Sequence, residues 1–154
     1  MTVTFVDDRD DPLPAAPLVR LAEIVLEGET VPVRSEVALT IVDVVEMEEL
    51  NRVHMGETGP TDVLSFPLED AAPGNPPAAA PGGPPLLLGD VVICPQVVRD
   101  NADAEGSTFE DELALMVVHG LLHLLGYDHV DDADAELMEA RERSYLSAVG
   151  RRRR

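Results

Sequence analysis

Three of the four histidines of this chain fall within eleven residues, at His119, His123 and His129. A spacing of four residues places His119 and His123 one turn apart on the same face of a helix. Gly126 separates them from His129, and glycine readily adopts the positive φ that ends a helix and turns the chain. The third imidazole can then return to the other two. Three converging imidazoles that leave a fourth position open are typical of a catalytic zinc site.

The alternative is that these histidines are ordinary core residues bonded to backbone carbonyls, and a bare His-x-x-x-His pair is common by chance. The helix that carries His119 and His123 is otherwise uncharged from Leu113 to Leu125, however, so each ring would need its own buried partner. An unpaired buried polar group costs roughly 1–3 kcal/mol. Because one metal ion would satisfy all three rings together, we interpret them as ligands of one zinc ion per chain.

The spacing matches the His-Glu-x-x-His-x-x-Gly-x-x-His pattern of zinc proteases with one departure. Residue 120 is glycine, where a protease has the glutamate that deprotonates the attacking water. A metalloprotease is therefore a disfavoured alternative. Phosphodiester cleavage stays open, because a metal ion lowers the pKa of its own bound water and neutralises phosphoryl oxygens. In mid-helix, Gly120 is a position where alanine would be favoured.

The elements that must position these histidines follow from hydrophobic periodicity and helix caps. We expect strands over residues 2–6, 37–42, 61–66 and 86–93, and helices over 17–28, 43–53, 96–103, 107–125 and from Asp131 or Asp132 to 148. Asp43 with Glu46 and Ser107 with Glu110 have the spacing of capping boxes. The helix that carries the histidines is apolar on nearly every side, which predicts that it is buried in the middle of the domain. Alternating strands and helices indicate an α/β or α+β fold with helices covering one small sheet.

The length of 154 residues suits a single domain over 1–150, followed by an arginine tail at 151–154 that we expect to be frayed. Residues 71–85 comprise 6 Pro, 3 Gly, 5 Ala and one Asn, which predicts a mobile surface loop. Net charge is −19, and outside the tail 30 acidic residues face 7 arginines. This charge repels phosphate backbones at long range. Aromatic residues are only 3% of the chain, which disfavours RNA recognition by stacked aromatics.

The sequence favours a cytoplasmic protein without membrane association. The N-terminus lacks the basic and apolar regions of a signal peptide. The longest apolar run, Leu113 to Gly126, is interrupted by two histidines and is shorter than the roughly 18 residues of a membrane span. Cys94 has no cysteine partner, and we expect it to be a small buried hydrophobic residue.

The histidine segment resembles the signature of the YbeY family, which are bacterial single-strand-specific endoribonucleases of ribosomal RNA maturation. The matching residues are His119-Gly-x-Leu-His123-Leu-x-Gly126-Tyr-Asp-His129. Two further segments are similar to blocks of the same family. They are Leu50-Asn51 followed by Gly59-Pro-Thr-Asp-Val-Leu-Ser-Phe-Pro67, and Leu88-Gly-Asp-Val-Val-Ile93. Together these segments extend the resemblance from about residue 36 to 147.

The resemblance implies a small mixed four-stranded sheet flanked by helices, with zinc held by His119, His123 and His129. It implies cleavage of single-stranded ribosomal RNA, in 3′-end maturation of the small-subunit RNA and in ribosome quality control. The partners would be the small ribosomal subunit or its assembly factors. The acidic charge is compatible with this role, because the metal and a few arginines can supply local positive potential. A non-catalytic, zinc-containing ribosome assembly factor is the other alternative.

Three further residues are candidates for chemistry, although a water on the metal is the expected attacking group. Asp128 is adjacent to His129 and could orient an imidazole or act on the water, or it could be a turn residue. Asp90 could lie on the strand nearest the metal, or it could stabilise a bulge. Ser65 could bind substrate through its hydroxyl group, or it could pack within its strand.

Many members of the family have an arginine after an aromatic residue that follows the Leu-Asn helix. This sequence has His54-Met55 at that place, so the arginine contact to RNA is missing. Arg52 lies three residues earlier and could substitute as a phosphate anchor, or it could be a solvated surface residue. His54 is most simply a helix-end residue.

Overall fold

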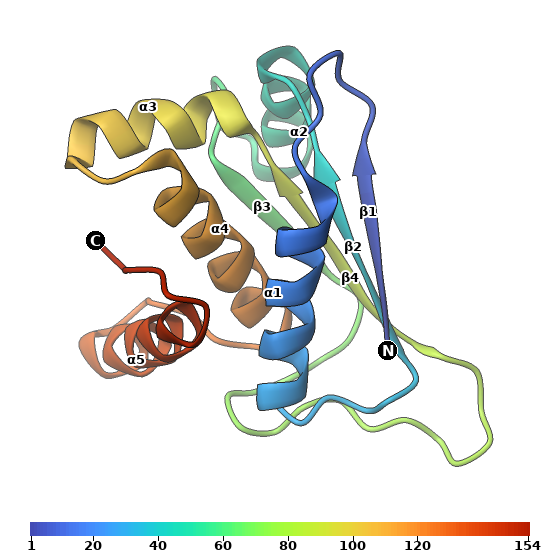
Figure 1. Ribbon diagram of the computed structural model, residues 1–154. Helices are drawn as coiled ribbons and strands as arrows, with labels where there is room; N and C mark the ends of the chain where they lie inside the picture. The colour runs from blue at the N-terminus through green and yellow to red at the C-terminus, as the bar shows by residue number, and fades with distance from the viewer.

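The computed structural model describes residues 1–154 and contains five helices around one four-stranded sheet (Figure 1). The strands are β1 (Thr2–Asp7), β2 (Ser35–Ile41), β3 (Val63–Pro67) and β4 (Leu86–Ile93). The helices are α1 (Ala15–Gly28), α2 (Val44–Met55), α3 (Pro95–Glu105), α4 (Phe109–Leu124) and α5 (Asp132–Ala148). Every element expected from the sequence is present, with ends that differ by at most two residues.

The sheet is mixed. Its strand order is β1-β2-β4-β3, with β2 parallel to both β1 and β4, and β3 antiparallel to β4. The expected fold class, a small mixed four-stranded sheet flanked by helices, is confirmed.

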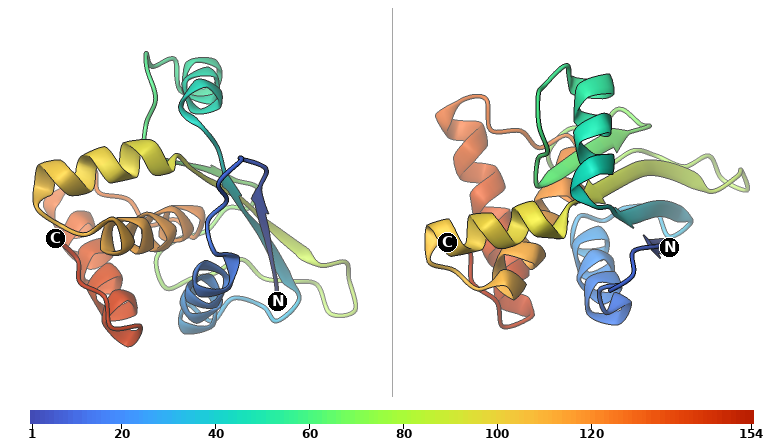
Figure 2. Two further views of the ribbon diagram at one scale, coloured as in Figure 1. Left: turned by 45° about the horizontal axis from the view of Figure 1, so that its top comes forward. Right: turned by 90° about the horizontal axis from the view of Figure 1, so that it is seen from above.

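Helices cover both faces of the sheet, and α2 stands apart from the other four (Figure 2). Side chains on β4 alternate between the two faces. Val91 and Ile93 join the large core built around α1 and α4. Val92 belongs to the smaller core on the opposite face, with Met47 of α2 and Leu64 of β3.

Helix α4 is the centre of the large core. Eleven of its sixteen residues are buried, which confirms the expected central buried helix. It contacts α1, α3 and α5 as well as β3 and β4. No helix of the structure combines the length and apolar character that crossing a membrane requires.

Two of the expected helix caps are present and one is wrong. Asp43 and Asp131 accept hydrogen bonds from the backbone N–H groups three residues ahead, at 2.8 Å each. Helix α4, however, is capped by Thr108 and not by Ser107, because the Thr108 hydroxyl accepts the bond from the N–H of Asp111. The Ser107 hydroxyl instead donates to the side chain of Glu112 at 3.3 Å.

The arginine tail is not frayed, which corrects the sequence-based expectation. The N–H of Arg151 donates to the carbonyl of Leu146 at 2.8 Å, so the chain folds back after α5. The side chain of Arg154 forms an ion pair of 2.6 Å with Glu112, whose carboxylate is buried. A frayed tail was expected from its position at the end of the chain, but in the folded protein its arginines pair with nearby carboxylates.

Candidate metal centre

The three histidines converge. His119 and His123 lie on the last turns of α4, and His129 lies in the segment before α5. One ring nitrogen of each lies within 4.8 Å of the others, and the Nε2 atoms of His119 and His123 are 3.0 Å apart. A tetrahedral ion with bonds of about 2.0–2.1 Å holds its nitrogen ligands roughly 3.3 Å apart. The His119 and His123 nitrogens are already near this spacing, and His129 lies within reach of the same point.

The turn that returns His129 to the helix depends on Gly126. This residue follows the C-cap of α4 with a φ of 92°, so the expected positive φ is confirmed. A Cβ atom at this position would also overlap the carbonyl oxygen of Ala71, at the start of the loop between β3 and β4. Glycine is thus required both by backbone conformation and by a close approach of two chain segments.

Glu142 of α5 orients the His119 ring. The Nδ1–H of His119 donates to Oε2 of Glu142 at 2.8 Å, which leaves Nε2 of the same ring free to bind a metal. The Glu142 side chain is only 1% exposed. Burial tends to raise its pKa, but hydrogen bonds from His119 and Arg153 outweigh burial, and the net pKa lies below the usual value. Glu142 is therefore an ionised partner for the ring.

Sequence reasoning missed Glu142, which lies 23 residues after His119. A signal was present in the spacing. Met138, Glu142 and Tyr145 are all buried, and they share one face of α5 at intervals of four and three residues. An acidic residue between two core positions indicates a buried carboxylate that needs a partner.

The environment of His123 favours its neutral form. Burial of the His123 ring, and then the neighbouring rings of His119 and His129, hold its pKa below the usual value for histidine. Since a metal binds the neutral imidazole, this environment keeps the lone pair of His123 available at neutral pH.

A cleft of about 390 Å³ opens beside the histidines. Besides the three rings, its lining residues come from β3 and the residue before it: Asp62, Val63, Leu64, Ser65 and Pro67. The Ser65 hydroxyl donates to the carbonyl of Gly120 at 2.8 Å, so it joins β3 to the helix α4 that carries His119 and His123. Sequence reasoning did not select Asp62 as a site residue. Its carboxylate accepts bonds from its neighbours Thr61 and Val63 and from Asn101.

The other candidates do not share this cleft. Asp128 is exposed, and its carboxylate accepts a bond from the backbone N–H of His129 at 2.8 Å. Asp90 is exposed on β4 with its side chain directed to the sheet face opposite Val91, away from α4, so it lies apart from the histidines. Arg52 lies on α2 and pairs with Glu49 at 2.7 Å, with both side chains exposed.

A buried carboxyl group supports the segment between Gly126 and His129. Glu29, at the end of α1, accepts hydrogen bonds from the hydroxyl groups of Tyr127 at 2.5 Å and of Tyr145. Burial, together with this partner, raises the pKa of Tyr127 to about 12. Tyr127 is two residues before His129, so this contact holds the turn against α1 and α5.

Position 120 is glycine and not the glutamate of the protease pattern because α4 packs closely against the sheet at this residue. A Cβ atom on Gly120 would meet Cγ1 of Val91 at 2.5 Å and Cγ2 of Val63 at 3.2 Å. Helix α4 therefore approaches the sheet at the one residue without a side chain. No glutamate fits there, and the sequence-based expectation that alanine would be favoured at this position is wrong.

We expect the substitution Gly120→Ala to destabilise the protein by about 1–3 kcal/mol, because overpacking forces helix and strand apart. Helix propensity alone predicts a gain of up to ~1 kcal/mol. Urea unfolding of the two proteins measures the difference. A variant at least as stable as the parent would show that the contact with Val91 is not a constraint.

Known proteins resemble this chain over nearly its whole length. The model of the family described as endoribonuclease YbeY matches residues 11–150. Endoribonuclease YbeY of Micrococcus luteus is 42% identical over 149 residues, which cover 97% of this chain and 92% of that protein. The Moorella thermoacetica protein of the same name is 46% identical over 136 residues, covering 88% and 86%. A Thermotoga maritima protein solved in solution superposes with a TM-score of 0.63 at 26% identity, over 96% of this chain and 91% of that one.

Proposed function

Because this chain belongs to the YbeY family, we propose that it is an endoribonuclease in which His119, His123 and His129 hold one metal ion. The convergence of three imidazole nitrogens beside an open cleft carries this proposal. Three protein ligands leave room for water or substrate, which distinguishes catalytic from structural zinc sites.

Zinc is the proposed ion, since an all-nitrogen set of three histidines suits its tetrahedral preference. When bound, it would lower the pKa of a water and offset negative charge on the phosphoryl oxygens. Glu142 holds His119 in the tautomer with a free Nε2. Burial keeps His123 neutral. Both residues are thus arranged as ligands before any ion arrives.

The proposed substrate is single-stranded ribosomal RNA, in 3′-end maturation of the small-subunit RNA and in ribosome quality control in the cytoplasm. The relatives named above are endoribonucleases, which supports RNA as the substrate. The cleft is lined by no arginine, so free RNA would bind modestly. The small ribosomal subunit or an assembly factor would supply the remaining affinity.

Among the side chains, Asp128 remains the candidate acid or base, since it lies next to His129 and is open to solvent. Ser65 is proposed to act through the Gly120 carbonyl more than through substrate. We do not include Asp90 or Arg52 in the site, because Asp90 faces away from α4 and Arg52 lies on α2, where it pairs with Glu49.

The test is to incubate the zinc-loaded protein with a single-stranded RNA, the same RNA as a duplex, and casein. We expect cleavage of the single strand only, loss of cleavage with a chelator, and recovery with added zinc. Cleavage of casein would indicate a metalloprotease. Bound metal without cleavage of any substrate would favour a non-catalytic assembly factor.

A separate prediction concerns Met55, which is 46% exposed at the end of α2, where the family resemblance implies an arginine. We expect Met55→Arg to tighten binding of single-stranded RNA. One added phosphate contact should steepen the slope of log K against log salt by about 0.7. The cleavage rate at saturating RNA should change less, because a uniform binding contact does not lower the chemical barrier.

Binding titrations at several salt concentrations measure this slope. The control is Val53→Arg, which adds the same charge on the same helix at a residue that is 57% exposed. Equal effects of the two variants would show that position 55 is not a specific part of the RNA path.

A further inference from the structure

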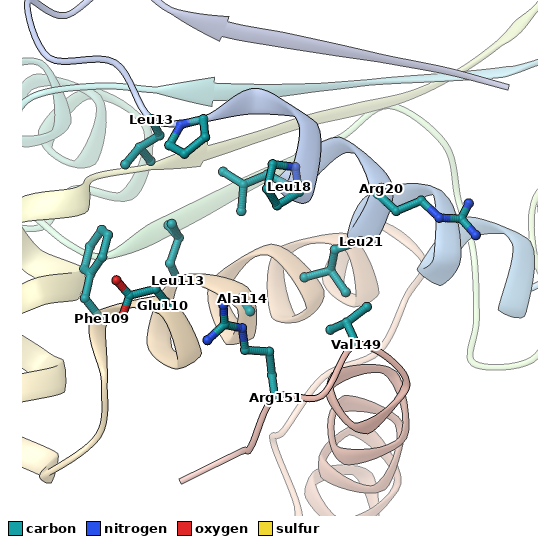
Figure 3. Close-up of a pocket in the computed structure, with 12 residues that line it drawn as sticks. Leu13, Leu18, Arg20, Leu21, Phe109, Glu110, Leu113, Ala114, Val149 and Arg151 are labelled. Atoms are coloured by element: carbon teal, nitrogen blue, oxygen red, sulfur yellow. The ribbon is translucent and has the colours of Figure 1, made fainter.

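The chain after α5 folds back against the first turn of α4, where its arginines pair with Asp111 and Glu112. Arg151 lies over α4 near Glu110 and Ala114, at the edge of an apolar cavity of about 410 Å³ (Figure 3). Its side chain is 3.4 Å from the carboxylate of Asp111. Together with the ion pair between Arg154 and Glu112, this contact fixes the tail on both sides of Arg153.

Arg153 contacts the same carboxylate that orients His119. Its Nε atom donates to Oε1 of Glu142 at 3.0 Å, while Oε2 of Glu142 accepts from His119. A second nitrogen of the guanidinium lies 3.3 Å from Glu139. The Arg153 side chain is 19% exposed and that of Glu142 is 1% exposed. The three groups therefore form a largely buried chain from the tail to the first ligand.

Each carboxylate oxygen of Glu142 has its own partner: Oε1 accepts from Arg153 and Oε2 accepts from His119. The guanidinium of Arg153 donates in fixed directions, from Nε to Glu142 and from a second nitrogen to Glu139, so it holds Oε1 of Glu142 in place. A restrained carboxylate in turn fixes the tautomer and the ring orientation of a metal-binding histidine. Without Arg153, one oxygen of a buried Glu142 would lose its partner, and the side chain would be free to rotate away from His119.

We propose that Arg153 is a positioning residue of the metal centre, which acts through Glu142 to aim Nε2 of His119 at the metal. The proposal rests on the metal site of the proposed function. It gives a structural role to one arginine of the tail at 151–154, whose composition alone indicates no such role.

A purely electrostatic role makes the opposite prediction. Arg153 is a cation near a cation site, so its removal should strengthen metal binding if Coulomb repulsion dominates. Loss of positioning should weaken binding instead. Arg152 provides the matched control, because it belongs to the same tail, is exposed and forms no ion pair.

The experiment compares Arg153→Ala, Arg153→Lys and Arg152→Ala with the parent protein. Zinc affinity is measured by competition with a chelating dye. We expect Arg153→Ala to weaken binding about 10-fold, at the low end of the effect of removing an outer partner of a ligand. Arg153→Lys should lie in between, since lysine keeps the charge without the planar fork. Arg152→Ala should stay within about twofold of the parent.

A second measurement needs no metal. Nitrogen-15 NMR of the histidine rings at pH 8 reports the tautomer of His119, and we expect a single Nδ1–H form in the parent and in Arg152→Ala. Arg153→Ala should show a mixture of tautomers. Thermal unfolding checks that each variant is folded. If Arg153→Ala does not fold, Arg153→Lys is compared with Arg152→Ala in its place.

The two proposals fail separately. A parent protein that binds no zinc would overturn the metal site of the proposed function, while the NMR comparison would still judge Arg153. Normal zinc binding in the parent, with Arg153→Ala and Arg152→Ala alike in both measurements, would overturn the role of Arg153.

Discussion

Replacing His123 with alanine is expected to remove the bound metal and, with it, cleavage of RNA. The substitution leaves two of the three nitrogen ligands. Loss of an outer partner of a ligand costs about 10–100-fold in metal affinity, and loss of a ligand should cost at least about 100-fold. The fold should survive, because the His123 ring is only partly buried and lies beside the open cleft. Metal content by elemental analysis and RNA cleavage measure the two effects.

The matched control is His54→Ala, which changes the one histidine outside the cluster. His54 packs against Phe66 on the other side of β3, with ring centres 5.1 Å apart. We expect it to retain both metal and cleavage. A His123→Ala protein that binds metal as tightly as the parent would contradict the proposed ligand set. Retained cleavage without metal would contradict metal dependence.

Replacing Gly126 with alanine is expected to lower the stability of the protein more than Gly120→Ala does. An alanine in the left-handed region costs about 1–2 kcal/mol. The overlap of its Cβ with the carbonyl of Ala71 adds about 1–3 kcal/mol, because one backbone segment must move. Together we expect a loss of about 2–5 kcal/mol in the free energy of unfolding, accompanied by lower metal content as His129 is displaced.

The control is Gly106→Ala, at the C-cap of α3. Gly106 has a φ of 69°, and a Cβ atom there would meet nothing within 4 Å. This variant therefore measures the cost of the backbone conformation alone, about 1–2 kcal/mol. Equal losses in the two variants would show that the approach of Ala71 to Gly126 contributes nothing, and that the turn depends on φ only.

Features that depend on neighbouring residues could be predicted from the sequence. Helix periodicity placed His119 and His123 on one face, and the glycine at 126 indicated the turn that returns His129. The caps at Asp43 and Asp131 follow from side chains that reach three residues along the chain. The cap at Ser107 is wrong by one residue, since a serine and a threonine stand side by side and local rules do not choose between them.

Features that depend on which distant segments meet could not be predicted in this way. Nothing near residue 119 indicates that Glu142 faces it from α5, or that Arg153 reaches the other oxygen of that carboxylate. Asp90 belongs to the right strand, but the alternation of β4 turns it away from α4, and a shift of one residue would reverse every side chain of a strand.

Local spacing in the sequence was thus enough to predict the histidine triad, its turn, and the helices and strands, because a helical turn spans only three to four residues. The requirement for glycine at 120, the close approach at Gly126 and the carboxylate behind His119 arose only when α4 packed against the sheet, the loop after β3 and α5. Local patterns set which side chains share a face. Packing sets what lies opposite that face, because burial brings together residues that are far apart along the chain.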